Sequence, residues 1–177
     1  MRNMTFLQVA KILDSTLAGG GLHVLVGMTG SGKSAICEIF KKKGKSHPAI
    51  YDVQTSRDAE TYLNIVDDIS TSKSHIIIDG YCAPSEIGNK VAESILNHVR
   101  GEYDGFGVLL VVQSIEDLTG FSFGVKTIFV IGNEFPRKPG KVFLKNFDVD
   151  ESERIPFDGI GEYSKLVNSG AHELSIL

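Results

Sequence analysis

Residues 27–34 read GMTGSGKS, and this glycine-rich segment follows the apolar run Leu22–Val26 and precedes a stretch with helical periodicity. A GxxxxGKS loop between a strand and a helix is the Walker A pattern, in which successive backbone N–H groups surround phosphate oxygens. Such a loop lies at the carboxyl edge of a mostly parallel sheet. The sequence therefore predicts an α/β fold around a strand–loop–helix unit that binds a phosphate chain.

The residue types in this loop each have a physical role. Gly27 and Gly32 let the backbone adopt conformations that a side chain would obstruct. Lys33 supplies a mobile positive charge for the β- and γ-phosphates, and Ser34 offers a hydroxyl to Mg²⁺. Because the helix behind the loop directs its positive dipole end at the phosphates, we expect ATP and Mg²⁺ to bind here. The residues expected to contact the nucleotide are Gly27, Met28, Thr29, Gly30, Ser31, Gly32, Lys33, Ser34 and Ala35.

Length and composition fit one globular domain, since 177 residues with 42% apolar side chains leave no room for a second full one. A net charge of −4 gives no overall basic field for nucleic acid or anionic membranes. The isolated cysteines Cys37 and Cys82 favour a reducing compartment and no structural zinc. No secretory signal or span of about 20 apolar residues is visible, so we expect a cytoplasmic protein (host cytoplasm or virion if viral) without membrane insertion.

Strand-like and helix-like segments alternate along the chain. Strands are expected at 22–26, 48–53, 74–79, 107–113 and 126–131, and an alternating run at 141–147 is typical of an edge strand. Helices are expected at 5–17, 33–43 and 85–100, and residues 59–69 fit a short helix or an irregular crossover. This alternation predicts a three-layer P-loop NTPase sandwich with a mostly parallel sheet.

We interpret residues 1–177 as a single P-loop NTPase domain with three parts. Residues 1–20 form an N-terminal amphipathic helix laid on the outside, and residues 21–147 form the core. Residues 148–177, which are rich in Asp, Glu, Ser and Gly, form a peripheral tail.

A second motif, Ile76–Ile78 followed by Asp79, has the form of a Walker B strand. The apolar residues bury the strand, so that Asp79 emerges at its carboxyl end beside the phosphate loop. There it can hold a water on Mg²⁺. The alternative is an aspartate that only caps the next turn.

Gln113 ends the next buried strand, residues 107–113. In a large division of NTPases an extra strand separates Walker A from Walker B, and that strand ends in a polar residue aimed at the γ-phosphate. The order of segments here suits that arrangement. Gln113 is therefore our candidate for sensing the γ-phosphate or its attacking water, although a plain strand-terminal amide is the alternative.

The segments GGLHVLVGMTGSGKS, HIIIDG, GVLLVVQS and VKTIFVIGN, in this order, resemble the FtsK/HerA superfamily of P-loop motors. That superfamily includes conjugative coupling proteins and the genome-packaging ATPases of some viruses. The resemblance covers roughly residues 20 to 147 and implies an ATPase that forms homo-oligomeric rings and moves DNA. Lys33, Asp79 and Gln113 would be its catalytic residues.

One position departs from this family, whose members commonly have a catalytic glutamate directly after the Walker B aspartate. Here the residue is Gly80, and Glu86 is the nearest glutamate that could reach back. Ring motors also complete their sites with an arginine from the next subunit. Arg137 and Arg100 are the candidates in this chain.

The dense basic run Lys41–Lys45 can either complement a helix dipole or contact nucleic-acid phosphates. Three other classes of protein were compared with this chain, and the first is a small P-loop kinase that phosphorylates a nucleotide or metabolite. The segment Ile78–Tyr81 is similar to part of adenylate-kinase-like enzymes, but the chain has few arginines for a second phosphorylated substrate. Pilus-retraction and secretion ATPases carry a similar TGSGKS loop, but their acidic and paired-histidine motifs are not evident. A nucleotide-gated assembly module with little turnover would also explain Gly80.

Overall fold

The computed structural model describes residues 3–100, 106–118, 120–121, 124–132 and 140–148. They form one sheet of seven strands in the order β1-β7-β6-β2-β5-β4-β3. The strands are β1 (Met4–Thr5), β2 (Gly21–Val26), β3 (Ala49–Asp52), β4 (Ile76–Asp79), β5 (Gly107–Val112), β6 (Val125–Gly132) and β7 (Lys141–Asp148). The helices are α1 (Phe6–Ala18), α2 (Lys33–Lys43), α3 (Ala59–Thr71), α4 (Gly88–Arg100) and the 3-10 helix η1 (Ile115–Asp117).

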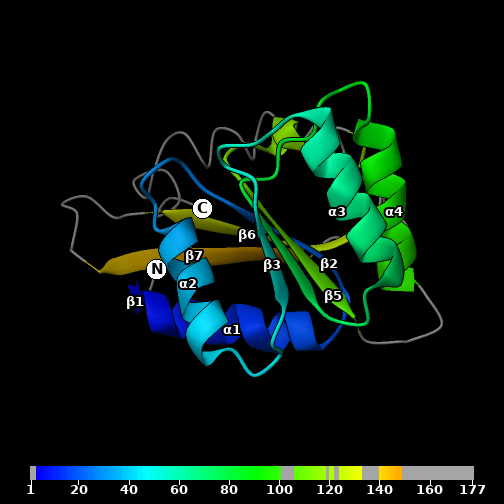
Figure 1. The fold of residues 1–177 in the computed structure, drawn as a ribbon. Helices are drawn as coiled ribbons and strands as arrows, with labels where there is room; N and C mark the ends of the chain where they lie inside the picture. Colours follow the sequence, from blue (N-terminus) through cyan, green and yellow to red (C-terminus); the bar gives the residue numbers. More distant parts are fainter. Residues whose placement is uncertain (1–2, 101–105, 119, 122–123, 133–139, 149–177) are drawn as a thin grey trace.

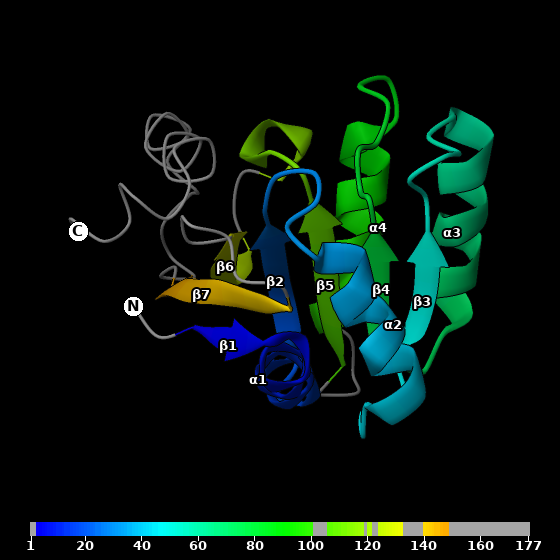
Figure 2. The same ribbon diagram turned by 90° about the vertical axis from the view of Figure 1, so that its left-hand side faces the viewer.

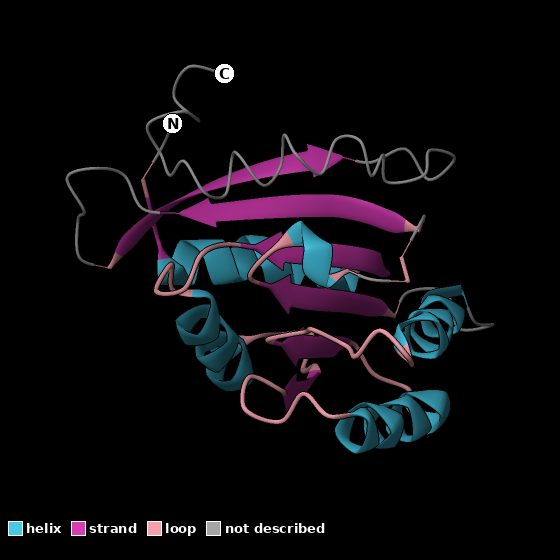
Figure 3. Cartoon of the chain, turned by 90° about the horizontal axis from the view of Figure 1, so that it is seen from above, coloured by secondary structure: helices cyan, strands magenta, loops and turns pink. Residues whose placement is uncertain are grey.

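Helices cover both faces of the sheet, with α1 and α2 on one side and α3 and α4 on the other (Figures 1 and 3). The central strand β2 contributes to both resulting cores. Leu22, Val24 and Val26 pack on the α3–α4 side, and Leu25 packs on the α1–α2 side. Because both faces are covered, all residues of β2 from Leu22 to Val26 are buried, and all of these except His23 are apolar. The predicted three-layer α/β sandwich is confirmed.

The strand order brings the ends of the two motif strands close together. β5 lies between β2 and β4 and runs parallel to both, with Val112 opposite Val26 and Val111 opposite Asp79. Figure 2 shows these strands side by side with their carboxyl ends at one edge. The prediction that one strand separates the Walker A strand from the Walker B strand is therefore confirmed.

β7 lies at the other side of the sheet and is the predicted edge strand over Phe143–Asp148, where β6 is its one partner among the described residues, but not over Lys141 and Val142. It pairs antiparallel with β6 on one side and with the two-residue strand β1 on the other, where Met4 lies opposite Val142. A pair of residues is too short to give a periodic signal. The predicted tail, 148–177, lies outside the described residues except for Asp148.

Local hydrogen bonds explain where the helices begin. The Asp58 side chain accepts the N–H of Thr61 at 2.9 Å and caps α3, which is a regular helix of 13 residues and no irregular crossover. Thr5 and Gln8 form a reciprocal capping box at the start of α1. Within the described part of the chain, no helix combines the length and apolar character that crossing a bilayer requires.

Candidate functional site

A cavity of about 260 Å³ opens at the carboxyl edge of the sheet, beside the loop between β2 and α2. It brings together Lys33, Ser34, Asp79 and Gln113, which the sequence had singled out from three separate segments. Its lining consists of Thr29, Gly30, Gly32, Lys33, Ser34, Ala35, Gln54, Arg57, Asp79, Gly80, Val112 and Gln113. The other three predicted nucleotide contacts do not line it: Gly27 and Ser31 are buried, and the side chain of Met28 is exposed.

The loop delivers the N-terminus of α2 to this cavity. Gly32 is the N-cap with a φ of +97°, and no side chain caps the first N–H groups of the helix. A Cβ at Gly32 would lie 2.6 Å from Cε1 of Phe6, so both the conformation and the space require glycine. A helix terminus with uncapped N–H groups at a cavity is suited to binding an anion.

The Lys33 ammonium bends back over the loop. It donates to the carbonyl oxygen of Gly27 and, at 2.9 Å, to that of Met28. Burial lowers the pKa of Lys33 below its ordinary value, and the charge of Asp79 counters part of this decrease. The ammonium is therefore held at the rim of the phosphate loop by backbone oxygens, bonds that phosphate oxygens could replace.

Asp79 and Ser34 lie close together although they come from different elements. The side-chain amide nitrogen of Gln54 donates to Ser34 Oγ at 3.0 Å and to Asp79 Oδ2 at 3.1 Å. One nitrogen atom can thus reach both oxygens at once. A hydroxyl and a carboxylate are the hard oxygen ligands that Mg²⁺ prefers. This pair therefore fits the expected metal, which Ser34 would bind directly and Asp79 would hold through a water.

The environment of Asp79 works against its charged form. Burial raises its pKa above the ordinary value of 3.8, a hydrogen bond from Ser34 acts in the opposite direction, and the carboxylate of Asp52 on β3 adds to the rise. A divalent cation at this place would favour the ionised carboxylate again. The charge of Asp79 therefore lowers the stability of the folded protein, and a bound metal cation would compensate for it.

We predict that Asp79→Asn stabilises the protein while it lowers ATP turnover. An aspartate with a raised pKa stabilises the fold below its unfolded pKa, and this contribution is lost as the pH rises through the folded pKa. At neutral pH the neutral amide should therefore raise Tm, by about 2–4 °C for each kcal/mol gained. Thermal denaturation at neutral pH tests this, with the exposed Asp67→Asn on α3 as control. A Tm equal to or below wild type would contradict it.

Gly80 follows Asp79 with a φ of +84°, and its neighbours leave no space for a side chain. A Cβ there would lie 2.5 Å from Cγ and 3.0 Å from Cα of Gln54. Its N–H and that of Tyr81 donate to the carbonyl of Val111 at 3.0 and 2.9 Å, which fixes the turn. The position where the resembling motors carry a glutamate thus requires glycine here.

We expect Gly80→Ala to lower the free energy of unfolding by about 2–4 kcal/mol, because positive φ and a close contact act together. Gly140→Ala is the matched control. Its φ is also positive, at +68°, but no atom lies within 4 Å of the added Cβ. It should therefore show only the cost of the backbone conformation, about 1–2 kcal/mol. Urea denaturation measures both, and equal losses would show that Gln54 does not crowd this position.

Two residues of the cavity, Gln54 and Arg57, were not found from the sequence. Both belong to the segment between β3 and α3. β3 pairs in parallel with β4 and places Asp52 opposite Asp79, so this segment starts at the same edge as the Walker B aspartate. The sequence could have indicated them only by their position directly after a predicted strand, because every parallel strand of such a sheet ends at this edge.

Three other candidates lie elsewhere. Glu86 is exposed in the turn before α4 and does not line the cavity. Arg100, at the end of α4, lies near Gly124, just before β6, at the opposite edge of the parallel strands. Arg137 lies outside the described residues. The basic run from Lys41 forms the exposed last turn of α2, where cations complement the helix dipole.

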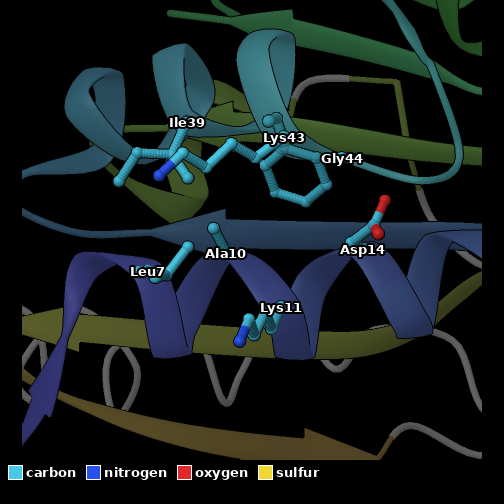
Figure 4. A pocket seen from close by; sticks show the side chains of 8 residues that line it. Leu7, Ala10, Lys11, Asp14, Ile39, Lys43 and Gly44 are labelled. Atoms are coloured by element: carbon cyan, nitrogen blue, oxygen red, sulfur yellow. The ribbon is translucent and has the colours of Figure 1, made fainter.

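A second hollow, of about 300 Å³, lies between α1 and α2 (Figure 4). Leu7, Ala10 and Ile39 give it apolar walls, with Lys11 and Lys43 at its rim. The carboxylate of Asp14, at one end, accepts the backbone N–H groups of Lys45 and Ser46 at 2.9 and 3.1 Å. This carboxylate therefore holds the segment after α2 against α1, a structural role.

Comparison with known proteins supports the fold alone. No protein-family model matches the chain, and no curated protein matches its sequence. The solved N-terminal domain of zonular occludens toxin from Neisseria meningitidis is similar, with a TM-score of 0.53 and 12% identity over 82% of this chain and 91% of that one. The ATPase DotB of Legionella pneumophila gives a TM-score of 0.51 and 13% identity over 93% of this chain and 58% of its own. The chain has a P-loop NTPase fold.

Proposed function

We propose that this protein binds and hydrolyses ATP with Mg²⁺. The observation that carries the proposal is the single cavity in which Lys33 and Ser34 of the phosphate loop meet Asp79 and Gln113 from two neighbouring strands. These residues supply a cation for the phosphates, two oxygen atoms that can hold a metal and a further polar group. That set matches what phosphoryl transfer to water requires.

Each side chain has a definite task in this reaction. The N–H groups at the start of α2 and the ammonium of Lys33 bind the β- and γ-phosphates. Ser34 and Asp79 would hold Mg²⁺, which neutralises charge that develops on the phosphate oxygens. The amide of Gln113 orients the attacking water in line with the γ-phosphate. Arg57 is the one described arginine in the cavity lining, and its charge can stabilise the same oxygens from within the subunit.

We further propose that the ATPase is a motor of the FtsK/HerA-like type that acts on DNA as a homo-oligomer. The strand order, with β5 between the motif strands, is in keeping with that resemblance. The similar structure of DotB, described as an ATPase, is in keeping with hydrolysis. The exposed lysines at the end of α2 are candidate phosphate contacts. Asp79 is the only carboxylate among the described residues of the cavity lining, so a neighbouring subunit would complete the site.

ATP turnover with and without double-stranded DNA tests this function. Clear stimulation by DNA, together with a larger particle in light scattering when ATP is present, is the expected result. Tight ATP binding without turnover would favour a nucleotide-gated assembly module, which is consistent with glycine at position 80 in place of a catalytic glutamate. Transfer of phosphate to a nucleotide or metabolite would favour a kinase. Either of these results would overturn the motor.

A further inference from the structure

Gln54 crosses from the end of β3 to the Walker B aspartate on β4. Its backbone is fixed there, since its N–H donates to Asp52 Oδ1 at 3.1 Å and the preceding N–H of Val53 donates to the carbonyl of Asp79 at 2.9 Å. Gly80 gives the side chain its path, because a Cβ at Gly80 would collide with Gln54 Cγ. Gln54 can therefore reach Asp79 only because the residue at position 80 has no side chain.

The end of this side chain lies where two metal ligands converge. The amide nitrogen of Gln54 is 3.0 Å from Ser34 Oγ and 3.1 Å from Asp79 Oδ2, and it donates a hydrogen to each. An NH₂ group has two hydrogens, so both are used. The amide thus occupies the lone pair of Ser34 that the metal would use and the lone pair of Asp79 to which a metal-bound water would donate.

We propose that Gln54 competes with Mg²⁺ for Ser34 and Asp79, so that the metal-bound nucleotide binds only when the amide leaves this position. The inference rests on the proposed nucleotide-binding function and concerns its regulation. The amide and the metal cannot occupy this place together, because the metal needs the lone pair of Ser34 Oγ, its bound water needs to donate to Asp79 Oδ2, and the positively polarised N–H hydrogens repel a cation. Gln54 therefore lowers the affinity for the metal-bound nucleotide and leaves the affinity for the metal-free nucleotide unchanged.

The test compares Gln54→Ala with wild type in binding a fluorescent ATP analogue, once with excess EDTA and once with Mg²⁺. Removing the two competing hydrogen bonds should tighten binding in Mg²⁺ about tenfold, which corresponds to about 1.4 kcal/mol. The Kd in EDTA should change by less than about twofold. Since the Gln54 side chain is exposed, the variant is expected to fold. Thr55→Ala, at an exposed neighbour in the same loop, is the matched control and should behave as wild type.

Gln54→Glu gives a second and opposite change at the same place. It replaces a competing donor by a third oxygen ligand, so Mg²⁺ should increase nucleotide affinity more than it does in wild type, and EDTA should weaken binding through repulsion with Asp79. The proposal is overturned if the ratio of Kd in EDTA to Kd in Mg²⁺ is the same in wild type and Gln54→Ala, or falls in that variant. If wild type binds no nucleotide in either condition, the proposed function itself fails, which is a separate result.

Discussion

Lys33→Ala is expected to abolish detectable ATP turnover and to weaken nucleotide binding on the order of 100-fold, because a charged donor to the phosphates is lost. The structure adds a second cause. The ammonium also bonds the carbonyl oxygens of Gly27 and Met28, so its removal releases the loop from the geometry that presents the N-terminus of α2. Binding and turnover should therefore fall together.

Lys41→Ala is the matched control for this prediction. It removes the same charge from the same helix, but at its exposed last turn and outside the cavity. Turnover without DNA should stay within about twofold of wild type, as expected for an exposed substitution. Isothermal titration with an ATP analogue and a phosphate-release assay measure the two quantities. Wild-type turnover in Lys33→Ala would exclude this cavity as the hydrolytic site.

Gln113→Ala should separate binding from hydrolysis. The side chain is exposed directly after β5 and lines the same cavity as the phosphate loop, so its loss removes no contact of the core. We expect nucleotide affinity within about threefold of wild type but turnover at least about 100-fold lower, since a water-orienting group is lost. Single-turnover measurements with saturating ATP distinguish this from weaker binding.

The control for Gln113→Ala is Asn97→Ala. Asn97 lies on α4, its side-chain amide is also exposed, and it does not line the cavity. It should leave both affinity and turnover unchanged. If Gln113→Ala hydrolyses ATP at the wild-type rate, β5 still separates the two motif strands, but its terminal amide has no part in catalysis. Arg57, another polar side chain of the lining, would then be examined next.

The centre of the sheet could be predicted because its strands are buried and mostly apolar and lie next to motifs with known places. Towards the edges, β3 and β7 were predicted as well, but β1 was not. Met4 and Thr5 pair with β7 through only two residues, and no local pattern marks so short a strand. The side chains of β3 are only partly buried or exposed, so the strand gave a weaker signal than β4.

The candidate site divides in the same way. Lys33, Ser34 and Asp79 belong to motifs whose residue types and spacing follow from phosphate chemistry. Gln54 and Arg57 lie in a segment without such a pattern, and they reach the cavity only because β3 pairs in register with β4, with Asp52 opposite Asp79. Side chains that act from a neighbouring strand become visible only when the pairing is known.

The contact between Phe6 and Gly32 makes the first helix part of the phosphate loop's support. The aromatic ring of Phe6, at the start of α1, lies against Gly32, the last residue before α2. α1 itself is anchored in the core by its buried residues Val9, Ala10, Leu13 and Leu17. The smallest fragment that keeps the loop in shape must therefore include Phe6, although the Walker A motif begins at Gly27. A shortened chain that starts at β2 would retain every motif residue and lose the surface on which the loop rests.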